Sequence, residues 1–77
     1  MTKNEFLREL EILLKAEPGF LNENTPIEGL KGWDSLMNME FRMFVEEELG
    51  RDVDGLKVER AQSVGELIAL VNDLLED

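Results

Sequence analysis

The chain has 77 residues, enough for one small domain, and it contains neither cysteine nor histidine. Because thiol and imidazole groups are missing, the sequence offers no disulfide, no cysteine metal site and no serine–histidine pair, and we expect neither an enzyme nor a metal site. Eighteen acidic residues against eight basic ones give a net charge of -10. This charge would repel nucleic acids and anionic membrane surfaces and attract a basic protein partner, although solubility alone would also explain it.

The start of the chain, from Met1 to Phe6, is charged and lacks the apolar segment of a signal peptide. No apolar run approaches the roughly 20 residues that a membrane-spanning helix needs. We therefore expect a cytoplasmic protein that does not insert into a membrane. Nothing in the sequence marks an oligomer, and we expect a monomer.

The first helical pattern runs from about Lys3 to Ala16. Thr2 and Glu5 have the spacing of a capping box, in which each side chain binds the backbone N–H of the other residue. A Pro-Gly pair at positions 18–19 ends the pattern. Apolar residues at helical spacing then define one side of this helix: Phe6, Leu7, Leu10, Leu13 and Leu14.

Residues 18–33 show no sustained period and are rich in glycine and proline, which predicts a long loop. A connection of this length is unusual in a compact domain and is often functional. A flexible linker between two half-domains is the alternative. Four spaced apolar residues favour a loop that is held on the core: Phe20, Leu21, Ile27 and Leu30.

Two further long helices are predicted, from Ser35 to Leu49 with Gly50 at its end, and from Val64 to Leu75 after a second capping-box spacing at Ser63 and Glu66. The stretch 51–62 between them could support one short helical turn through Val53, Leu56 and Val58. The apolar stripe of the last helix comprises Val64, Leu67, Ile68, Val71, Leu74 and Leu75. The expected fold class is therefore all-α: a small four-helix bundle of three long helices and one short helix, with a long first loop, forming a single domain over residues 1–77.

The helix over 35–49 has two apolar sides when it is projected at helical periodicity. Phe41, Val45 and Leu49 form the expected core side, and nearly opposite them lie Leu36, Met39 and Met43. Glu40, Glu46 and Glu47 are interleaved with this second set. The methionines could instead be buried, but unpaired carboxylates cannot be, so the sequence favours an exposed docking surface.

Ser35 lies at the expected start of this helix, where outward-pointing N–H groups and the helix dipole favour a negative group such as a phosphodiester. Helix capping by Asp34 or Ser35 is the simpler interpretation, and the two roles are compatible. A catalytic serine would need a base, and the nearest candidate, Lys31, lies in the loop with nothing to position it. We therefore do not expect a hydrolase.

The segment Asp34-Ser35-Leu36 resembles the Asp-Ser-Leu motif of acyl and peptidyl carrier proteins. The likeness extends over nearly the whole chain. It includes the length, the acidity, the long first loop, the glutamate-rich helix that ends at residues 45–50, and the capped last helix that begins at residues 63–64.

The resemblance implies a four-helix bundle whose motif serine, here Ser35, receives a covalent 4′-phosphopantetheine arm from coenzyme A and carries acyl or aminoacyl groups as thioesters. It implies that Asp34 and Leu36 are read by a phosphopantetheinyl transferase. Loading and condensing enzymes with basic patches would then dock on the helix that follows, through Met39, Glu40, Met43, Glu46 and Glu47.

Trp33 before the motif and Met37 after it differ from the residues usual in fatty-acid-synthesis carriers. The segment Gly-Trp-Asp-Ser-Leu at positions 32–36 is more similar to that of stand-alone carriers of polyketide, nonribosomal-peptide or aminoacyl (including D-alanyl) pathways. The leading expectation is thus a carrier for a specialised pathway. A general fatty-acid carrier, and an acidic helical interaction module that uses no cofactor, are the alternatives.

Overall fold

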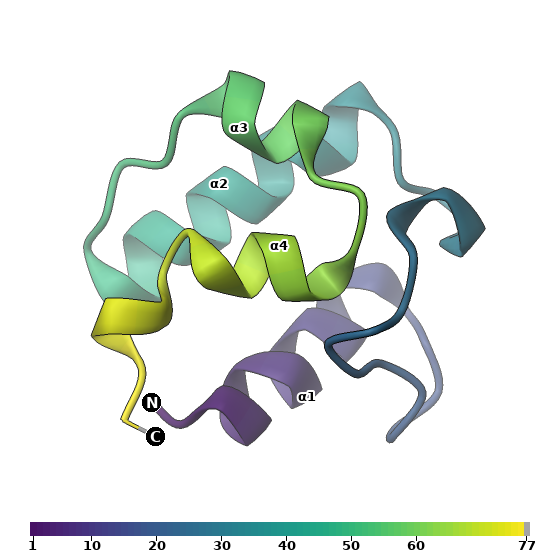
Figure 1. The fold of residues 1–77 in the computed structure, drawn as a ribbon, viewed down its shortest axis with the longest axis horizontal. Coiled ribbons are helices and arrows are strands. Elements are labelled where there is room, and N and C mark those ends of the chain that lie inside the picture. The colour runs from purple at the N-terminus through teal and green to yellow at the C-terminus, as the bar shows by residue number, and fades with distance from the viewer. Residues whose placement is uncertain (77) are drawn as a thin grey trace.

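Helices make up the regular structure of the computed structural model, which describes residues 1–76. The elements in chain order are α1 (Lys3–Leu14), η1 (Ile27–Gly29), α2 (Ser35–Leu49), α3 (Gly55–Arg60), α4 (Val64–Ala69) and η2 (Asn72–Leu74), where η marks a 3₁₀-helix (Figure 1). Within residues 1–76 there is no β-strand, only an isolated antiparallel bridge between Pro26 and Ser63. The prediction of a small, mostly helical protein is confirmed. None of the helices in this part of the chain has the length and apolar character needed to cross a membrane.

α1 begins with the predicted capping box, since Thr2 Oγ1 accepts the Glu5 N–H (3.1 Å) and Glu5 Oε1 accepts the Thr2 N–H (2.8 Å). The helix ends at Leu14, two residues before the predicted end. Lys15 adopts the left-handed conformation (φ 57°), and its N–H bonds to Ile12 O at 3.2 Å, which closes the last turn. The chain therefore leaves α1 before the Pro-Gly pair is reached.

α2 spans the predicted residues Ser35–Leu49. At its start the Asp34 carboxylate accepts the Met37 N–H (2.9 Å), and at its end Gly50 takes a left-handed conformation (φ 69°) and donates its N–H to Glu46 O (3.0 Å). Both ends of this helix are thus fixed by local sequence.

The prediction of a third long helix over 64–75 is wrong. α4 stops at Ala69, and the chain turns through Leu70 and Val71 into η2. The turn has a physical cause: the Arg51 guanidinium donates to Leu70 O (3.1 Å) and also forms two bonds of 2.7 Å to the Asp73 carboxylate. These contacts from a distant loop favour a tight turn over a continuous helix.

The short helix in the stretch 51–62 is confirmed as α3, which Asp54 caps by accepting the Leu56 N–H (2.9 Å). Val53 and Val58 are buried, as expected for residues that hold this turn on the bundle. Leu56, in contrast, is exposed.

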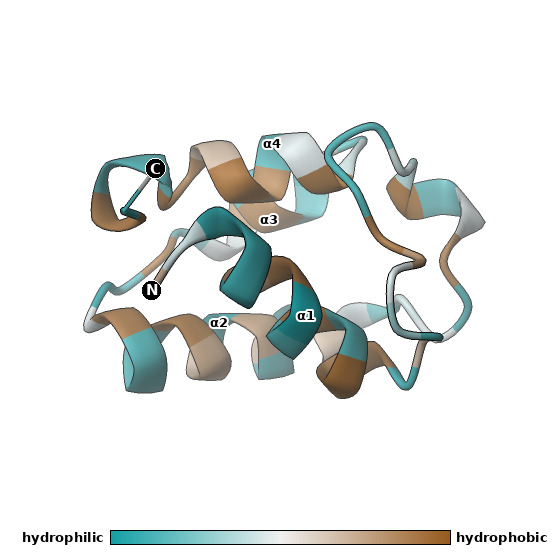
Figure 2. Cartoon of the chain, turned by 90° about the horizontal axis from the view of Figure 1, so that it is seen from below, coloured by the Kyte–Doolittle hydropathy of each residue, from teal (hydrophilic) through white to brown (hydrophobic). Residues whose placement is uncertain are grey.

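The core gathers side chains from α1, α2, α3 and α4, and the buried rings of Phe6 in α1 and Phe41 in α2 meet edge to face (6.2 Å between ring centroids). Figure 2 shows that each labelled helix carries both apolar and polar residues, as expected for helices that bury one side. The buried apolar residues are Phe6, Leu10, Leu21, Ile27, Leu30, Phe41, Val45, Val53, Val58, Ala61, Val64, Leu67, Ile68 and Val71.

The long first loop is fixed to the bundle rather than free. Glu11, a carboxylate only 2% exposed, accepts the N–H groups of Gly19 (3.1 Å) and Leu21 (2.9 Å). Further along, Val64 donates its N–H to Thr25 O (2.9 Å), which joins the loop to the start of α4. The alternative of a flexible linker between two half-domains is therefore wrong.

Three of the four predicted loop anchors, Leu21, Ile27 and Leu30, are buried. Phe20 is not: it is 54% exposed, so its prediction as an anchor is wrong. The paired N–H bonds at Glu11 hold this part of the loop instead, and they leave the Phe20 ring at the surface.

Candidate functional site

The approach to Ser35 is held in place by Trp33, which is partly buried and packs its ring against Phe41 (6.1 Å between ring centroids). Gly32 before it has a positive φ of 80°, which glycine adopts without the cost that a side chain would bring. Trp33 therefore sets the direction from which the chain enters α2, and with it the position of Asp34.

Asp34 and Ser35 have separate roles in the structure. Asp34 is the N-cap residue, because its side chain accepts the Met37 N–H. Ser35 is the first helical residue and is exposed, and its hydroxyl forms no hydrogen bond to any residue in the range 1–76. Since Asp34 supplies the cap, the Ser35 hydroxyl is available for another reaction partner.

The backbone around Ser35 favours an anion. The Ser35 and Leu36 N–H groups belong to the first turn of a 15-residue helix, where no earlier carbonyl can accept them. Such groups, together with the helix dipole, stabilise a negative charge near the N-terminus. These N–H groups would therefore help to stabilise a phosphodiester on Ser35 Oγ.

A groove of about 420 Å³ lies beside Ser35 between α2 and α3. Asn38 joins its two walls, since its amide Nδ2 donates to Gly55 O at 3.2 Å. Arg42 Nε donates in turn to Asn38 Oδ1 at 3.0 Å. The groove is lined by Trp33, Asp34, Ser35, Asn38, Arg42, Gly55 and Glu59, and most of these residues are polar or charged.

The second apolar side of α2 is exposed, as predicted. Leu36, Met39 and Met43 have between 45% and 58% of their surface accessible. Glu46 and Glu47 are exposed beside them, whereas Glu40 is half-buried. The prediction that Met39 and Met43 are surface residues is thus confirmed, and the alternative of buried methionines is wrong.

The motif serine, its two neighbours and the predicted docking residues all belong to one element, since Asp34 caps α2 and the others lie along it. Leu56 adds an exposed apolar side chain on α3, one residue after Gly55, which lies against Asn38 and Arg42. The sequence did not predict the exposure of Leu56, because a leucine in a short helix is more commonly a core residue.

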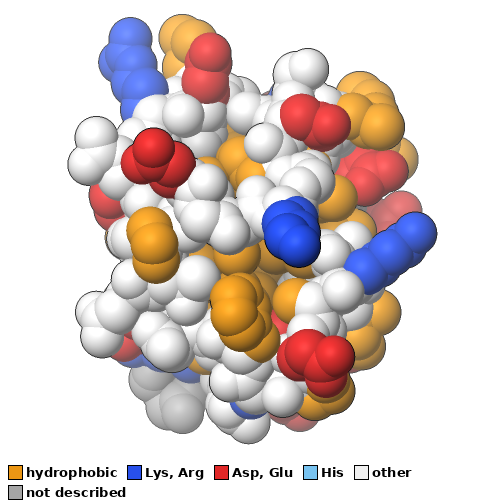
Figure 3. Space-filling view, turned by 90° about the vertical axis from the view of Figure 1, so that its right-hand side faces the viewer, with side chains coloured by type: hydrophobic (Ala, Val, Ile, Leu, Met, Phe, Trp, Pro, Cys, Tyr) orange, Lys and Arg blue, Asp and Glu red, His pale blue; other side chains and the backbone are white. Residues whose placement is uncertain are grey.

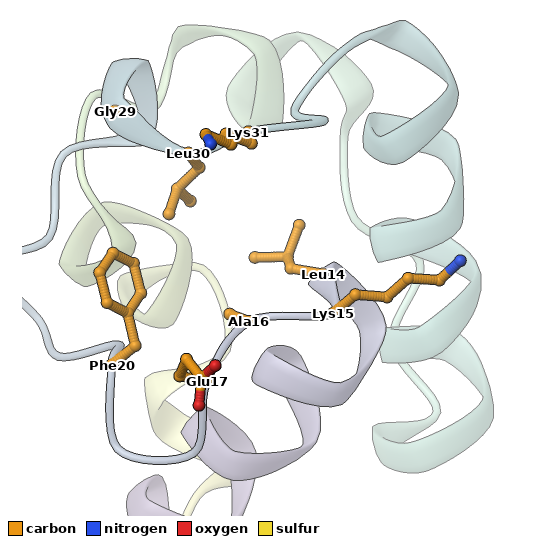
Figure 4. A pocket seen from close by; sticks show the side chains of 8 residues that line it. All are labelled: Leu14, Lys15, Ala16, Glu17, Phe20, Gly29, Leu30 and Lys31. Carbon is orange, nitrogen blue, oxygen red and sulfur yellow. The ribbon is translucent and has the colours of Figure 1, made fainter.

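A second pocket, of about 340 Å³, lies between the end of α1 and the segment around η1 (Figure 4). Leu14 and Leu30 extend toward each other across it, while the ammonium end of Lys15 points away. Figure 3 shows apolar side chains exposed at the centre of the face on the right of Figure 1, with charged groups around them. Phe20, which also lines this pocket, is exposed.

Two polar residues of the site were not singled out by sequence reasoning, namely Asn38 and Arg42. Their four-residue spacing on one helix is a signal that could have paired them. Arg42 is also the one basic residue between Asp34 and Gly50. In the part of the chain that the structure describes, no group of three or more acidic residues could hold a metal ion.

Comparison of the chain with protein-family models, with curated proteins and with solved structures found no match.

Proposed function

We propose that this chain is a stand-alone carrier protein that holds acyl or aminoacyl groups as thioesters on a 4′-phosphopantetheine arm attached to Ser35. The observation that carries the proposal is the exposed Ser35 hydroxyl at the first residue of α2, left unbonded within residues 1–76 because Asp34 provides the helix cap. The resemblance of Asp34-Ser35-Leu36 to the carrier motif supplies the chemistry.

The residues present fit the arm. In the loading step, Ser35 Oγ attacks the phosphorus of coenzyme A that bears the pantetheine. A new P–O bond forms, the bond between the two phosphates breaks, and the adenosine bisphosphate half leaves. The hydroxyl proton passes to a base of the transferase, since this chain has no histidine to accept it. The arm then supplies the thiol that this cysteine-free chain lacks.

Recognition by the transferase and by loading and condensing enzymes is proposed to use the exposed side of α2. Apolar side chains surrounded by acids suit a partner whose surface combines an apolar pocket with lysine and arginine residues. Between Asp34 and Gly50 the chain has five acids and one base, so this element carries a local charge of -4. The charge would steer a basic partner toward Ser35.

A specialised pathway is favoured over fatty-acid synthesis. The residues that line the groove beside Ser35 include Asn38, Arg42 and Glu59. A long alkyl chain buried there would displace water from these polar and charged groups and offer them no hydrogen-bonding partner in return. Aminoacyl and other short polar groups carry no such cost.

An acidic interaction module without a cofactor is the second candidate, because the exposed apolar side of α2 could bind a partner even if Ser35 is never modified.

The test is incubation of the folded protein with coenzyme A and a broad-specificity phosphopantetheinyl transferase, followed by intact-mass measurement. We expect the wild type to gain one phosphopantetheine and the Ser35→Ala variant to gain none. Circular dichroism should show the same helix content for both, because Asp34 and not Ser35 caps α2. A folded wild type that gains no mass with several transferases would favour the cofactor-free interaction module.

A further inference from the structure

Arg42 is a base inside a strongly acidic element, and it faces the groove beside Ser35. It is partly buried on α2, seven residues after the serine. Its side chain turns toward the start of the helix, because Nε bonds to Oδ1 of Asn38, one turn after Ser35 (3.0 Å). The guanidinium is thereby brought close to the attachment point.

The wall formed by α3 fixes this position. A Cβ atom built on Gly55 would lie 3.3 Å from the guanidinium carbon of Arg42, so the absence of a side chain at Gly55 lets the guanidinium approach the backbone of α3. Asn38 is held in turn by its bond to Gly55 O (3.2 Å). Arg42 is therefore a preorganised group and not a freely moving surface side chain.

The guanidinium has no acidic partner within the described residues, since none of their carboxylates lies within 4.0 Å of its nitrogens. Asp34, on the same groove, uses its carboxylate to cap α2, and Glu59 lines the groove without pairing with Arg42. The Nη groups of Arg42 are therefore available to an anion that comes from outside the chain.

We infer that Arg42, positioned by Asn38, binds the phosphodiester of the arm on Ser35 and so holds the first part of the arm in the groove between α2 and α3. This inference rests on the proposed function. The phosphorus would be bonded to Ser35 Oγ, and residues three apart on a helix have Cβ atoms roughly 5–6 Å apart. The phosphodiester therefore reaches the region of Asn38, where the guanidinium lies. Arginine suits this role because its planar fork binds phosphate oxygens in pairs.

The test compares unmodified and modified protein in four backgrounds: wild type, Arg42→Gln, Arg42→Lys and Arg60→Gln. Arg60 is an exposed base on α3 that does not line the groove, so its variant is the matched control for lost charge. The modified form carries a free thiol and no cargo, so the phosphodiester is the only new anion. Tm and the ³¹P NMR signal of the arm are recorded for each protein at low and high salt.

We expect attachment of the arm to raise Tm in the wild type by about 4 °C or more, and to raise it equally in Arg60→Gln. Most of that rise should be lost in Arg42→Gln, with an intermediate value in Arg42→Lys, which keeps the charge and loses the fork. The ³¹P shift should change in Arg42→Gln and not in Arg60→Gln. If Arg42→Gln does not fold, the test rests on two other measurements: the rise in Tm of Arg42→Lys on attachment of the arm, and the salt dependence of that rise in the wild type.

An equal rise in Tm for wild type and Arg42→Gln, with an unchanged ³¹P shift, would overturn the role of Arg42 and leave the proposed carrier function intact. The role would also be overturned if the rise in Tm depends on Arg42 only after a carboxylate-bearing acyl group has been loaded, because Arg42 would then bind the cargo. Absence of any mass gain on Ser35 would overturn the proposed function and this inference with it.

Discussion

Glu11 shows how one side chain organises the segment that leads to Ser35. Its buried carboxylate accepts N–H groups from Gly19 and Leu21, and Arg8 Nε lies 3.1 Å from the same carboxylate. Burying a carboxylate that lacks such partners would carry a large desolvation cost. The long loop therefore starts from a fixed point, and its path toward Trp33 is set near its beginning.

Replacing Glu11 by glutamine tests this role. Glutamine has one oxygen where glutamate has two, so one of the two loop N–H groups would face an amide NH₂. We expect Glu11→Gln to lower the free energy of unfolding by about 1.5–3 kcal/mol in urea denaturation. Glu9→Gln, at an exposed position of the same helix, should change it by less than about 0.5 kcal/mol. Equal losses in the two variants would contradict the anchoring role.

Gly65 is a second residue on which the loop depends. A Cβ atom there would lie 2.7 Å from the backbone oxygen of Glu23, which accepts the Gly65 N–H at 2.9 Å. We expect Gly65→Ala to cost about 1–3 kcal/mol of stability, because the loop backbone would have to move away from α4. Gly29→Ala is the matched control, since its Cβ would only touch Pro26 at 3.7 Å. An alanine tolerated equally at both positions would show that loop and α4 do not meet closely.

Among the elements, α4 shows what a long-range contact does to a helix. Arg51 binds both Leu70 O and Asp73, and the chain turns at that point. The hydrogen bond from Arg51 holds the pKa of the Asp73 carboxyl below its ordinary value of 3.8. A carboxyl whose pKa is lowered by folding stabilises the folded state above its unfolded pKa, and this contribution is lost as the pH falls through the folded value.

We therefore expect Asp73→Asn to lower Tm at neutral pH and to have a diminishing effect as the pH is taken below 3.8. Asp52→Asn, an exposed acid beside Arg51, is the control for loss of charge alone. Thermal unfolding of the three proteins across this pH range provides the measurement. A difference between wild type and Asp73→Asn that stays constant into the acid range would contradict the ion pair.

The acidic, apolar side of α2 makes a separate prediction about association. We expect Glu47→Lys to lower kcat/KM for loading by the transferase on the order of tenfold at low salt and much less at high salt, because screening removes long-range steering. Glu9→Lys makes the same charge change on the exposed side of α1 and should have a smaller effect. Equal slowing at both salt concentrations would rule out steering and point to a direct contact.

The elements that could be predicted are those fixed by neighbouring residues. Both ends of α2 and the first capping box follow from side chains within a few positions of the bonds they make. The break after Ala69 could not be predicted, because the partner of Leu70 O is Arg51, nineteen positions earlier. The exposure of Phe20 likewise depends on Glu11, whose burial no local pattern reveals.

For the molecule as a whole, the part of the candidate site that lies along the single helix α2 was predictable. The motif at 34–36 and the exposed methionines can be read from sequence and helical periodicity. The groove could not be, since it forms only where Gly55 of α3 meets Asn38 and Arg42 of α2. A contact between two helices depends on how they pack against each other, and this packing cannot be derived from the pattern of residues along each helix.

The bundle also distinguishes the two serines of the chain. Ser63 Oγ accepts the Glu66 N–H (3.3 Å) at the start of α4, whereas the Ser35 hydroxyl has no such bond within residues 1–76. The most direct test is therefore a peptide map of the wild type and Ser63→Ala after loading with coenzyme A and transferase. We predict one phosphopantetheine on Ser35 in both proteins. Modification at Ser63, or none on either folded protein, would contradict the account.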